Sequence, residues 1–221
     1  LMFEKDCEYD IREKDTCWYK NICDCSRCGN NFCIRHYKMS SLTHMALMEG
    51  NLRYPIQLKL DNEKTDLEAY TRLKAIQSDI VNFVNSGKNL LIYSEYTGNG
   101  KTEWAKKLML SWFDNIWSTT DFECRGLFIS LPQLITAMRS NISKPNEYFQ
   151  YVNENIINAD LVIWDELNYK DYTDFEHEYL LNIINQRTAM GKSNIYTTNY
   201  NLDTISQKLG TRLSSRILGY S

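Results

Sequence analysis

One short segment combines glycines, a lysine and a threonine at a spacing that suits phosphate binding. Residues 94–102 read SEYTGNGKT, in which Gly100, Lys101 and Thr102 match the end of the pattern G-x-x-x-x-G-K-[S/T], while Glu95 stands at its first glycine position. Backbone N–H groups of such a loop wrap a phosphate. Lys101 would reach the β- and γ-phosphates, and the Thr102 hydroxyl would ligate Mg²⁺. The segment predicts a nucleotide site, and a chance glycine turn before a helix is the alternative.

The whole loop and the first residue of the following turn are expected to contact the nucleotide. The expected contacts are Thr97, Gly98, Asn99, Gly100, Lys101, Thr102 and Glu103. Of the nine glycines in the chain, two lie in this loop, where the backbone must come close to the phosphates without a Cβ in the way. Glu95 need not touch a phosphate, but its carboxylate near an anion site should weaken the affinity for the nucleotide.

An acidic pair follows a run of apolar residues farther along the chain. The text LVIWDEL places Asp165 and Glu166 directly after four apolar residues. In a parallel nucleotide-binding sheet, ligands lie at the carboxyl ends of the strands, where Asp165 can hold Mg²⁺ through water. Glu166 can act as a general base on the water that attacks the γ-phosphate. A solvated pair at a strand end is the alternative, which the phosphate loop upstream makes less favourable.

Polar and basic residues near the end of the chain can complete such a site. The segment NIYTTNYN contains Asn199, which could hydrogen-bond the γ-phosphate or the attacking water, or serve as a plain turn residue or helix cap. The segment LGTRLSSRIL places Arg212 and Arg216 four apart, on one helical face. Such arginines are usually solvated, but a guanidinium can also cancel charge on a transferring phosphoryl group. An arginine that acts in trans requires an oligomer.

A second group of reactive residues lies at the start of the chain. Six of the seven cysteines fall within the first 33 residues: Cys7, Cys17, Cys23, Cys25, Cys28 and Cys33. A C-x2-C pair with other cysteines nearby predicts a zinc site, because thiolates must converge tetrahedrally from short loops. One possible ligand set is Cys7, Cys17, Cys28 and Cys33, and another is Cys23, Cys25, Cys28 and Cys33 or His36. Spare thiols, an iron–sulfur cluster and disulfides are the alternatives, of which disulfides fit poorly with an intracellular nucleotide motif.

Short apolar runs and helical segments alternate around these motifs. The predicted buried strands cover 89–94, 126–131, 160–164 and 194–198, and the predicted helices cover 66–85, 101–117, a segment that opens at Pro132, 174–190 and 203–218. A further short helix fits 33–48. Buried strands that alternate with helices imply an α/β fold with a parallel sheet covered on both faces.

Composition limits the protein class and its partners. The chain has 221 residues, 43% of them hydrophobic and 24% charged, which is typical of one globular domain with a small appendage. The net charge of −3 provides no overall basic field, so any nucleic-acid site must be local. No apolar run reaches the roughly 18 residues of a membrane span, and the acidic N-terminal segment lacks the apolar core of a signal peptide.

Together the motifs resemble the AAA+ ATPase domain of the DnaC/DnaI-type replicative helicase loaders, especially the short versions of phages. The resemblance runs from about Leu67 to Leu218 and rests on IYSEYTGNGKTEWA, ADLVIWDEL, IYTTNYN and LGTRLSSRI, in that order and at the family's spacing. It implies a P-loop AAA+ (ASCE) fold with a three-layer parallel sheet. The implied roles are Lys101 and Thr102 as Walker A, Asp165 and Glu166 as Walker B, Asn199 as sensor 1, and Arg216 as arginine finger with Arg212 as its companion.

The resemblance also implies a function. It implies a Mg²⁺-dependent ATPase that loads a DnaB-type replicative helicase onto single-stranded DNA during phage DNA replication, in the cytoplasm of the bacterial host. The implied partners are that helicase, single-stranded DNA and other copies of the AAA+ domain, without a membrane. An IstB-like transposition helper shares the same core motifs. A non-hydrolysing modulator of a host loader is a third hypothesis, which the intact Lys101, Asp165 and Glu166 oppose and Glu95 slightly favours.

The motifs divide the chain near residue 60. Residues 1–60 are expected to form a cysteine-rich, zinc-binding module and linker, and residues 61–221 the AAA+ domain. In the DnaI-like loaders, a small zinc-binding N-terminal domain docks on the helicase, and the cysteine-rich segment is similar in position and size. The resemblance further implies a fifth strand after the arginine helix. Because the chain begins with Leu1 and ends at Ser221, we expect a trimmed chain that lacks this last strand.

Overall fold

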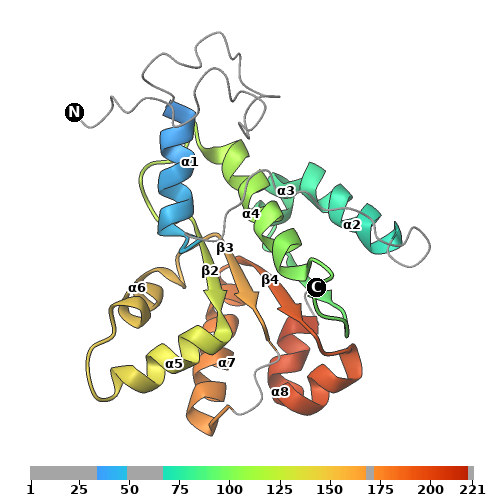
Figure 1. Cartoon of the computed structure of the whole chain (residues 1–221), viewed down its shortest axis with the longest axis vertical. Helices are drawn as coiled ribbons and strands as arrows, with labels where there is room; N and C mark the ends of the chain where they lie inside the picture. Colours follow the sequence, from blue (N-terminus) through green and yellow to red (C-terminus); the bar gives the residue numbers. More distant parts are fainter. Residues whose placement is uncertain (1–33, 49–66, 168–171, 219–221) are drawn as a thin grey trace.

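A parallel sheet forms the centre of the molecule. The structure, a computed structural model, describes residues 34–48, 67–167 and 172–218. Within these ranges the strands are β1 (Asn89–Tyr93), β2 (Gly126–Ser130), β3 (Leu161–Asp165) and β4 (Ser193–Thr198). All of their pairings are parallel, in the order β1-β4-β3-β2. Figure 1 labels the neighbouring strands β2, β3 and β4. The loops that follow β1, β3 and β4 therefore meet at one edge of the sheet.

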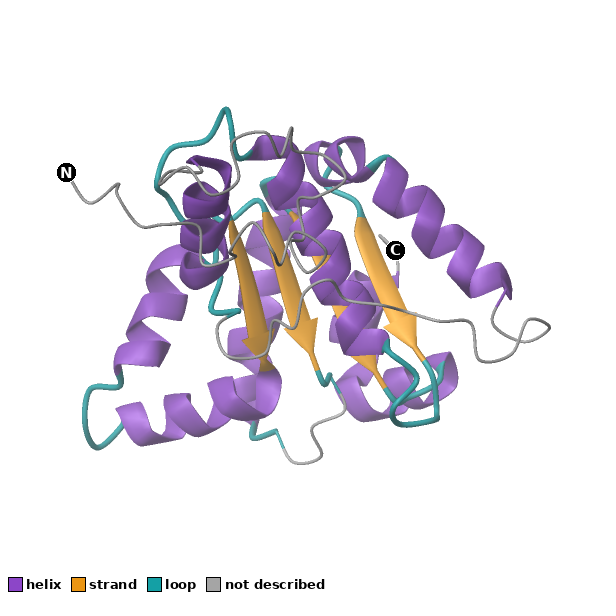
Figure 2. Ribbon diagram, turned by 45° about the horizontal axis from the view of Figure 1, so that its top comes forward, coloured by secondary structure: helices purple, strands orange, loops and turns teal. Residues whose placement is uncertain are grey.

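Helices cover both faces of this sheet (Figure 2). One face carries α1 (Ile34–Met45), α2 (Leu67–Ser78), α3 (Ile80–Asn85) and α4 (Lys101–Ile116). The other face carries α5 (Leu131–Asn141), α6 (Glu147–Asn155), α7 (Asp174–Ala189) and α8 (Leu202–Leu218). Each set of helices shares one buried hydrophobic cluster with the strands, which gives the three layers that the sequence predicts.

Strand β3 shows why the sequence of this sheet is almost continuously apolar. Leu161 and Ile163 are buried against the α4 side, whereas Val162 and Trp164 are buried against the α7 side. Successive side chains of a strand point to opposite faces, so a strand with helices on both faces needs apolar residues at every position. The run therefore ends where Asp165 reaches the carboxyl edge of the sheet.

The predicted strands are confirmed to within one residue at each end, whereas two helix predictions need correction. The single helix expected over 66–85 is two helices, separated at Asp79, which has φ −118° and ψ 31°. Helix α6 is absent from the sequence predictions. Its nine residues are short and polar on average and bury only Phe149 and Val152, and its start depends on the Asn146 side chain, which accepts a hydrogen bond from the Phe149 N–H.

Helix α1 packs into the same cluster as α4, although it precedes residue 60 in the chain. Met39, Leu42 and Ala46 are almost completely buried. The Ala46 carbonyl accepts a hydrogen bond of 2.8 Å from the Phe128 N–H at the outer edge of β2, and the Tyr151 hydroxyl donates to the Met45 carbonyl at 2.7 Å. Residues 1–33 and 49–66 lie outside the described residues, so the division near residue 60 stays a prediction. Among the helices that the structure describes, none has the length and apolarity needed to cross a membrane.

Candidate nucleotide site

The loop between β1 and α4 has the backbone conformation that the glycine pattern predicts. Gly98 and Gly100 have φ values of 78° and 86°, in the left-handed region that L side chains rarely adopt. Gly100 is the N-cap residue of α4, so the loop lies against the N-terminus of that helix. Unpaired N–H groups at a helix N-terminus favour an anion. The loop therefore offers a phosphate-binding backbone.

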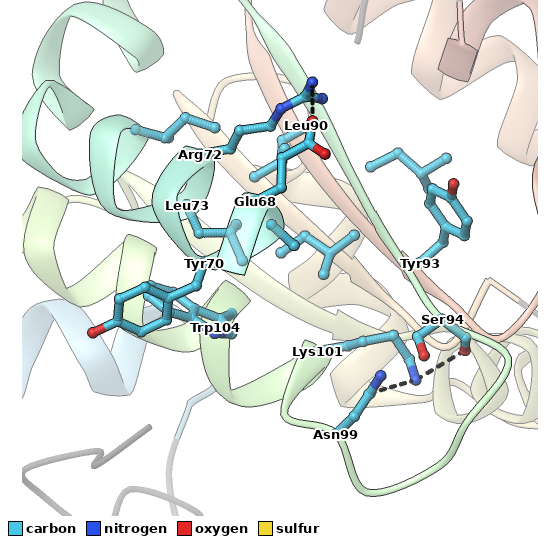
Figure 3. Close-up of a pocket in the computed structure, with 14 residues that line it drawn as sticks. Glu68, Tyr70, Arg72, Leu73, Leu90, Tyr93, Ser94, Asn99, Lys101 and Trp104 are labelled. Atoms are coloured by element: carbon cyan, nitrogen blue, oxygen red, sulfur yellow. Dashed lines mark hydrogen bonds and ion pairs between the residues drawn. The ribbon is translucent and has the colours of Figure 1, made fainter. Parts of the chain in front are cut away.

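The Lys101 side chain folds back into this loop. Its ammonium donates to the carbonyl of Ser94 at 3.2 Å and to Asn99 Oδ1 at 3.1 Å (Figure 3). It also donates to the carbonyl of Tyr96 at 2.8 Å. Burial lowers the pKa of Lys101, while the charge of Asp165 acts in the opposite direction. Neutral acceptors thus hold the Lys101 ammonium group at the centre of the loop. When a phosphate binds, its charged oxygens can replace these acceptors as hydrogen-bond partners of Lys101.

The two predicted Mg²⁺ ligands lie in direct contact. The Thr102 hydroxyl, in the first turn of α4, donates to Asp165 Oδ1 at 2.8 Å. Asp165 is the last residue of β3 and is 7% exposed. Hydroxyl and carboxylate oxygens are the hard donors that Mg²⁺ prefers. The residues present therefore fit the metal, and the contact joins the phosphate loop to the acidic pair.

Glu166 directs its side chain to solvent from an unusual backbone conformation. Its φ is 60°, and its side chain is exposed. At this φ, the backbone of any residue other than glycine is strained. Such a conformation persists only where surrounding contacts stabilise it. Here the Glu166 N–H donates to Thr197 Oγ1 at 3.1 Å, and the next N–H, that of Leu167, donates to the Thr197 carbonyl at 2.9 Å. Such strain is typical of functional loops.

Thr197 is the contact residue that sequence reasoning misses. Its hydroxyl also donates to Asp165 Oδ1 at 2.6 Å, so it touches both members of the acidic pair. The pattern of the strand favours Asn199, which lies half-buried just after β4. The signal that identifies Thr197 is the register between strands: Trp164 pairs with Tyr196, so the next residues along, Asp165 and Thr197, lie side by side.

The two arginines are not brought together with the other predicted site residues. Arg212 and Arg216 are exposed on the last part of α8, beyond a break at Gly210. Among the hydrogen bonds and ion pairs recorded for the described residues, none joins either arginine to Lys101 or to the acidic pair. Within one copy of the chain they are surface residues.

Glu95 has a partner that accounts for its position. Its Oε1 accepts a hydrogen bond of 2.8 Å from Asn201 Nδ2, on the connection between β4 and α8. Asn201 in turn accepts from the Thr204 N–H at 2.9 Å, in the first turn of α8. The residue that replaces the first glycine therefore links the phosphate loop to the start of the arginine-bearing helix.

Two clefts border the phosphate loop. A cleft of about 860 Å³ includes Thr102, Asp165 and Glu166 and is bounded by the end of α1, where His44 contributes. A second cleft of about 580 Å³ runs along β1 and α2 and reaches Lys101 (Figure 3). His44 belongs to no recognisable sequence motif. It reaches the first cleft because α1 packs against β2.

The predicted zinc site cannot be placed. The candidate ligands in the N-terminal segment lie outside the described residues, and within the part that the structure describes, no three or more His, Cys, Asp or Glu side chains cluster as metal ligands. Cys124 is a free, half-buried thiol. Burial raises its pKa to about 11, so it stays protonated and unreactive at neutral pH.

Comparison with known proteins shows the fold. No protein-family model and no curated protein matches the chain. The crystal structure of the DnaC helicase loader is 19% identical, with a TM-score of 0.60 over 75% of this chain and 92% of that one. Domain III of the Thermotoga maritima replication initiation protein DnaA is 15% identical, with a TM-score of 0.55 over 74% of this chain and 62% of that one. The replication initiator DnaA bound to AMPPCP and single-stranded DNA is 17% identical, with a TM-score of 0.56 over 77% and 49%. The chain therefore has the fold of the DnaC helicase loader and of DnaA domain III, the fold that the motif resemblance implies.

Proposed function

We propose that the chain is a Mg²⁺-dependent ATPase that loads a DnaB-type replicative helicase onto single-stranded DNA. The observation that carries the ATPase part is the contact between Thr102 and Asp165. It joins a glycine loop that contains a lysine to a strand end where Glu166 faces solvent. These are the groups that phosphoryl transfer requires, and they come from separate segments of the chain.

Each residue has a defined task in the proposed reaction. The loop N–H groups and the Lys101 ammonium bind the phosphates of ATP and counter their charge. Thr102 and Asp165 would hold Mg²⁺, which neutralises charge on the phosphate oxygens when bound. Glu166 accepts a proton from the water that attacks the γ-phosphate, and Asn199 orients that water or the γ-phosphate. In-line attack by this water then releases phosphate and leaves ADP.

ATP hydrolysis by the purified chain tests this proposal. Glu166→Gln should keep ATP binding and lose turnover, because the amide cannot accept the proton. Lys101→Ala should lose both ATP binding and turnover. The control Lys107→Ala, which changes a lysine farther along α4, should retain both. Equal losses of binding and turnover in Glu166→Gln would show that Glu166 has a structural role instead.

The helicase-loading part rests on the likeness to DnaC and on the order of the motifs. A loader contacts the helicase, single-stranded DNA and other copies of itself, and DnaA in a related structure is bound to single-stranded DNA. We propose that ATP controls the assembly of these partners during phage DNA replication, and that the cysteine-rich segment binds Zn²⁺ and docks on the helicase. Zinc analysis of the purified full chain by mass spectrometry tests the metal.

A binding experiment separates this function from its rivals. The replicative helicase should be retained by the immobilised chain, and the amount should change between ATP-bound and nucleotide-free conditions in wild type but not in Lys101→Ala. Binding to a transposase instead of the helicase would favour an IstB-like helper. Binding to a host helicase loader, with no ATP hydrolysis above that of Lys101→Ala, would favour a non-hydrolysing modulator. Glu95 at the first glycine position is the sequence feature that favours this alternative.

A further inference from the structure

Thr197 is a buried residue near the end of β4 whose hydroxyl is fully engaged. It is 2% exposed. Its hydroxyl donates to Asp165 Oδ1 at 2.6 Å and accepts from the Glu166 N–H at 3.1 Å. A hydroxyl has one proton to give and lone pairs to receive, so both capacities are used on the acidic pair.

The contact with Asp165 orients the carboxylate. Both hydroxyls that donate to it, those of Thr102 and Thr197, approach the same oxygen, Oδ1. The other carboxylate oxygen of Asp165, Oδ2, can then accept a hydrogen bond from a water. The Thr102 hydroxyl donates its hydrogen to Asp165, so its oxygen keeps a lone pair that can bind a cation. Hydrogen bonds to a charged acceptor are stronger than neutral ones, which restricts rotation of this buried carboxylate.

The contact with Glu166 fixes the backbone. The φ of 60° is held by hydrogen bonds from two successive N–H groups, those of Glu166 and Leu167, to the hydroxyl and carbonyl of Thr197. Without the hydroxyl, the Glu166 N–H loses its partner and the strained conformation loses one of its supports. The direction in which the Glu166 carboxylate leaves the strand end therefore depends on the Thr197 side chain.

We propose that Thr197 is a positioning residue of the ATPase, which sets the metal-binding carboxylate of Asp165 and the base Glu166 in one fixed relation. The inference rests on the proposed ATP hydrolysis. The neighbouring residue provides a matched comparison: Thr198 is 1% exposed, and its hydroxyl accepts a hydrogen bond of 3.1 Å from the Tyr200 N–H in the following turn. The Thr198 hydroxyl thus stabilises the turn after β4, whereas the Thr197 hydroxyl contacts the acidic pair.

The test compares Thr197→Val, Thr197→Ser and Thr198→Val. Valine has the shape of threonine without the hydroxyl. Each valine variant leaves one backbone N–H unpaired, and Thr197→Val also removes the hydrogen bond to Asp165, so Thr197→Val should be the less stable of the two. The kcat of Thr197→Val should fall roughly ten- to hundredfold, the range for one hydrogen bond to a charged group, while ATP affinity without Mg²⁺ stays within about twofold. Thr197→Ser should recover most of the kcat, and Thr198→Val should keep it.

A second readout does not depend on turnover. The Mg²⁺ concentration needed for half-maximal binding of AMPPCP should rise roughly tenfold in Thr197→Val, because an unrestrained carboxylate is a poorer ligand. Wild-type kcat and Mg²⁺ requirement in Thr197→Val, or equal losses in Thr198→Val, would overturn the inference. A wild-type chain without turnover contradicts the proposed ATPase instead. The role of Thr197 is then judged by AMPPCP binding, where an unchanged Mg²⁺ requirement in Thr197→Val overturns it.

Discussion

Glu95 places a carboxylate where the phosphate-loop pattern has its first glycine, and the hydrogen bond from Asn201 shows that it has a second role. Its charge opposes a bound phosphate, whereas its oxygen ties the loop to the start of α8. The first effect is weak in solvent and is screened by salt, since Glu95 is exposed. The two effects can be separated because a glutamine keeps the accepting oxygen and removes only the charge.

At the residue scale, Glu95→Gln should bind ATP more tightly than wild type. The expected gain is roughly two- to fivefold at low ionic strength, and it should shrink as salt is added, because a screened charge repels less. Titration of a fluorescent ATP analogue at several salt concentrations measures it. Glu123→Gln, a loop residue before β2, serves as the control and should leave the affinity unchanged. A gain of equal size in the control, or no gain at all, would show that Glu95 does not act on the site.

Helix α8 owes its shape to one glycine and to a contact from α7. Gly210 has φ 72° and ψ 159°, which breaks the helix before the segment that carries the two arginines. The carbonyl of Leu209, the residue just before the break, lies 2.5 Å from His177 Nε2. A neutral tautomer with the proton on Nε2, or the imidazolium, makes this a hydrogen bond. His177 resembles an ordinary surface residue in the sequence, but it caps the first half of α8.

At the element scale, Gly210→Ala should destabilise the fold and redirect the arginine segment. A Cβ at this φ costs about 1–3 kcal/mol, which a comparison of unfolding free energies in urea can detect. Ser215→Ala, on the exposed side of the same helix, should change the unfolding free energy by less than about 0.5 kcal/mol. If both variants unfold like wild type, the break does not depend on glycine.

The start of α7 predicts a dependence of stability on pH. Thr173 and Glu176 form a capping box, and Arg139 donates two hydrogen bonds to the buried Glu176 carboxylate, at 2.7 Å and 3.1 Å. These bonds from Arg139 are the main cause that lowers the pKa of Glu176, against the opposing effect of burial. A carboxyl with a lowered pKa adds stability above its unfolded-state pKa, and the stability is lost as pH falls through the folded-state pKa.

Glu176→Gln should therefore be less stable than wild type at pH 7, by roughly 1–2 kcal/mol because Arg139 is half-exposed. The difference in unfolding free energy should narrow as the pH falls below the unfolded-state pKa of glutamate, about 4.3, and on through the lowered pKa of the folded-state carboxyl. Glu178→Gln, an exposed neighbour on α7, should match wild type throughout. A difference that stays constant from pH 7 to acid would assign the effect to packing rather than charge.

At the scale of the whole molecule, the positions of Arg212 and Arg216 predict a site shared between copies. Both arginines are exposed, and no recorded contact among the described residues joins them to the acidic pair, which opens into a cleft of its own. If Arg216 counters charge on the γ-phosphate, we therefore expect it to act at the site of another copy of the chain.

Mixing two inactive variants tests this arrangement. Arg216→Ala keeps its own acidic pair, and Glu166→Gln keeps its own arginine, so a mixture should recover part of the ATPase activity that neither shows alone. Adding the double variant Arg216→Ala/Glu166→Gln to Arg216→Ala provides the control and should recover nothing. If the mixture of single variants is as inactive as its components, or if Arg216→Ala is fully active in an assembled complex, the arginine does not act in trans.

The sequence predicts this molecule best where the cause is local. Gly98 and Gly100 adopt the left-handed conformations that glycine permits, and the buried strands are recognisable because both of their faces need apolar side chains. It predicts least where tertiary contacts decide the outcome. The break at Asp79 interrupts a continuous helical pattern without a glycine or proline to mark it, and α6 is short and polar on average.

What the sequence by itself determined is the set of reactive groups and the strand or loop on which each stands. Only the tertiary structure decided which of them touch. The order β1-β4-β3-β2 places β4 between the phosphate-loop strand and the strand of the acidic pair, so Thr197 meets Asp165 and Thr102 meets the same carboxylate. The physical reason is that strand pairing joins residues far apart in the chain. Which strands become neighbours depends on how the helices cover both faces of the sheet, and no short motif records that.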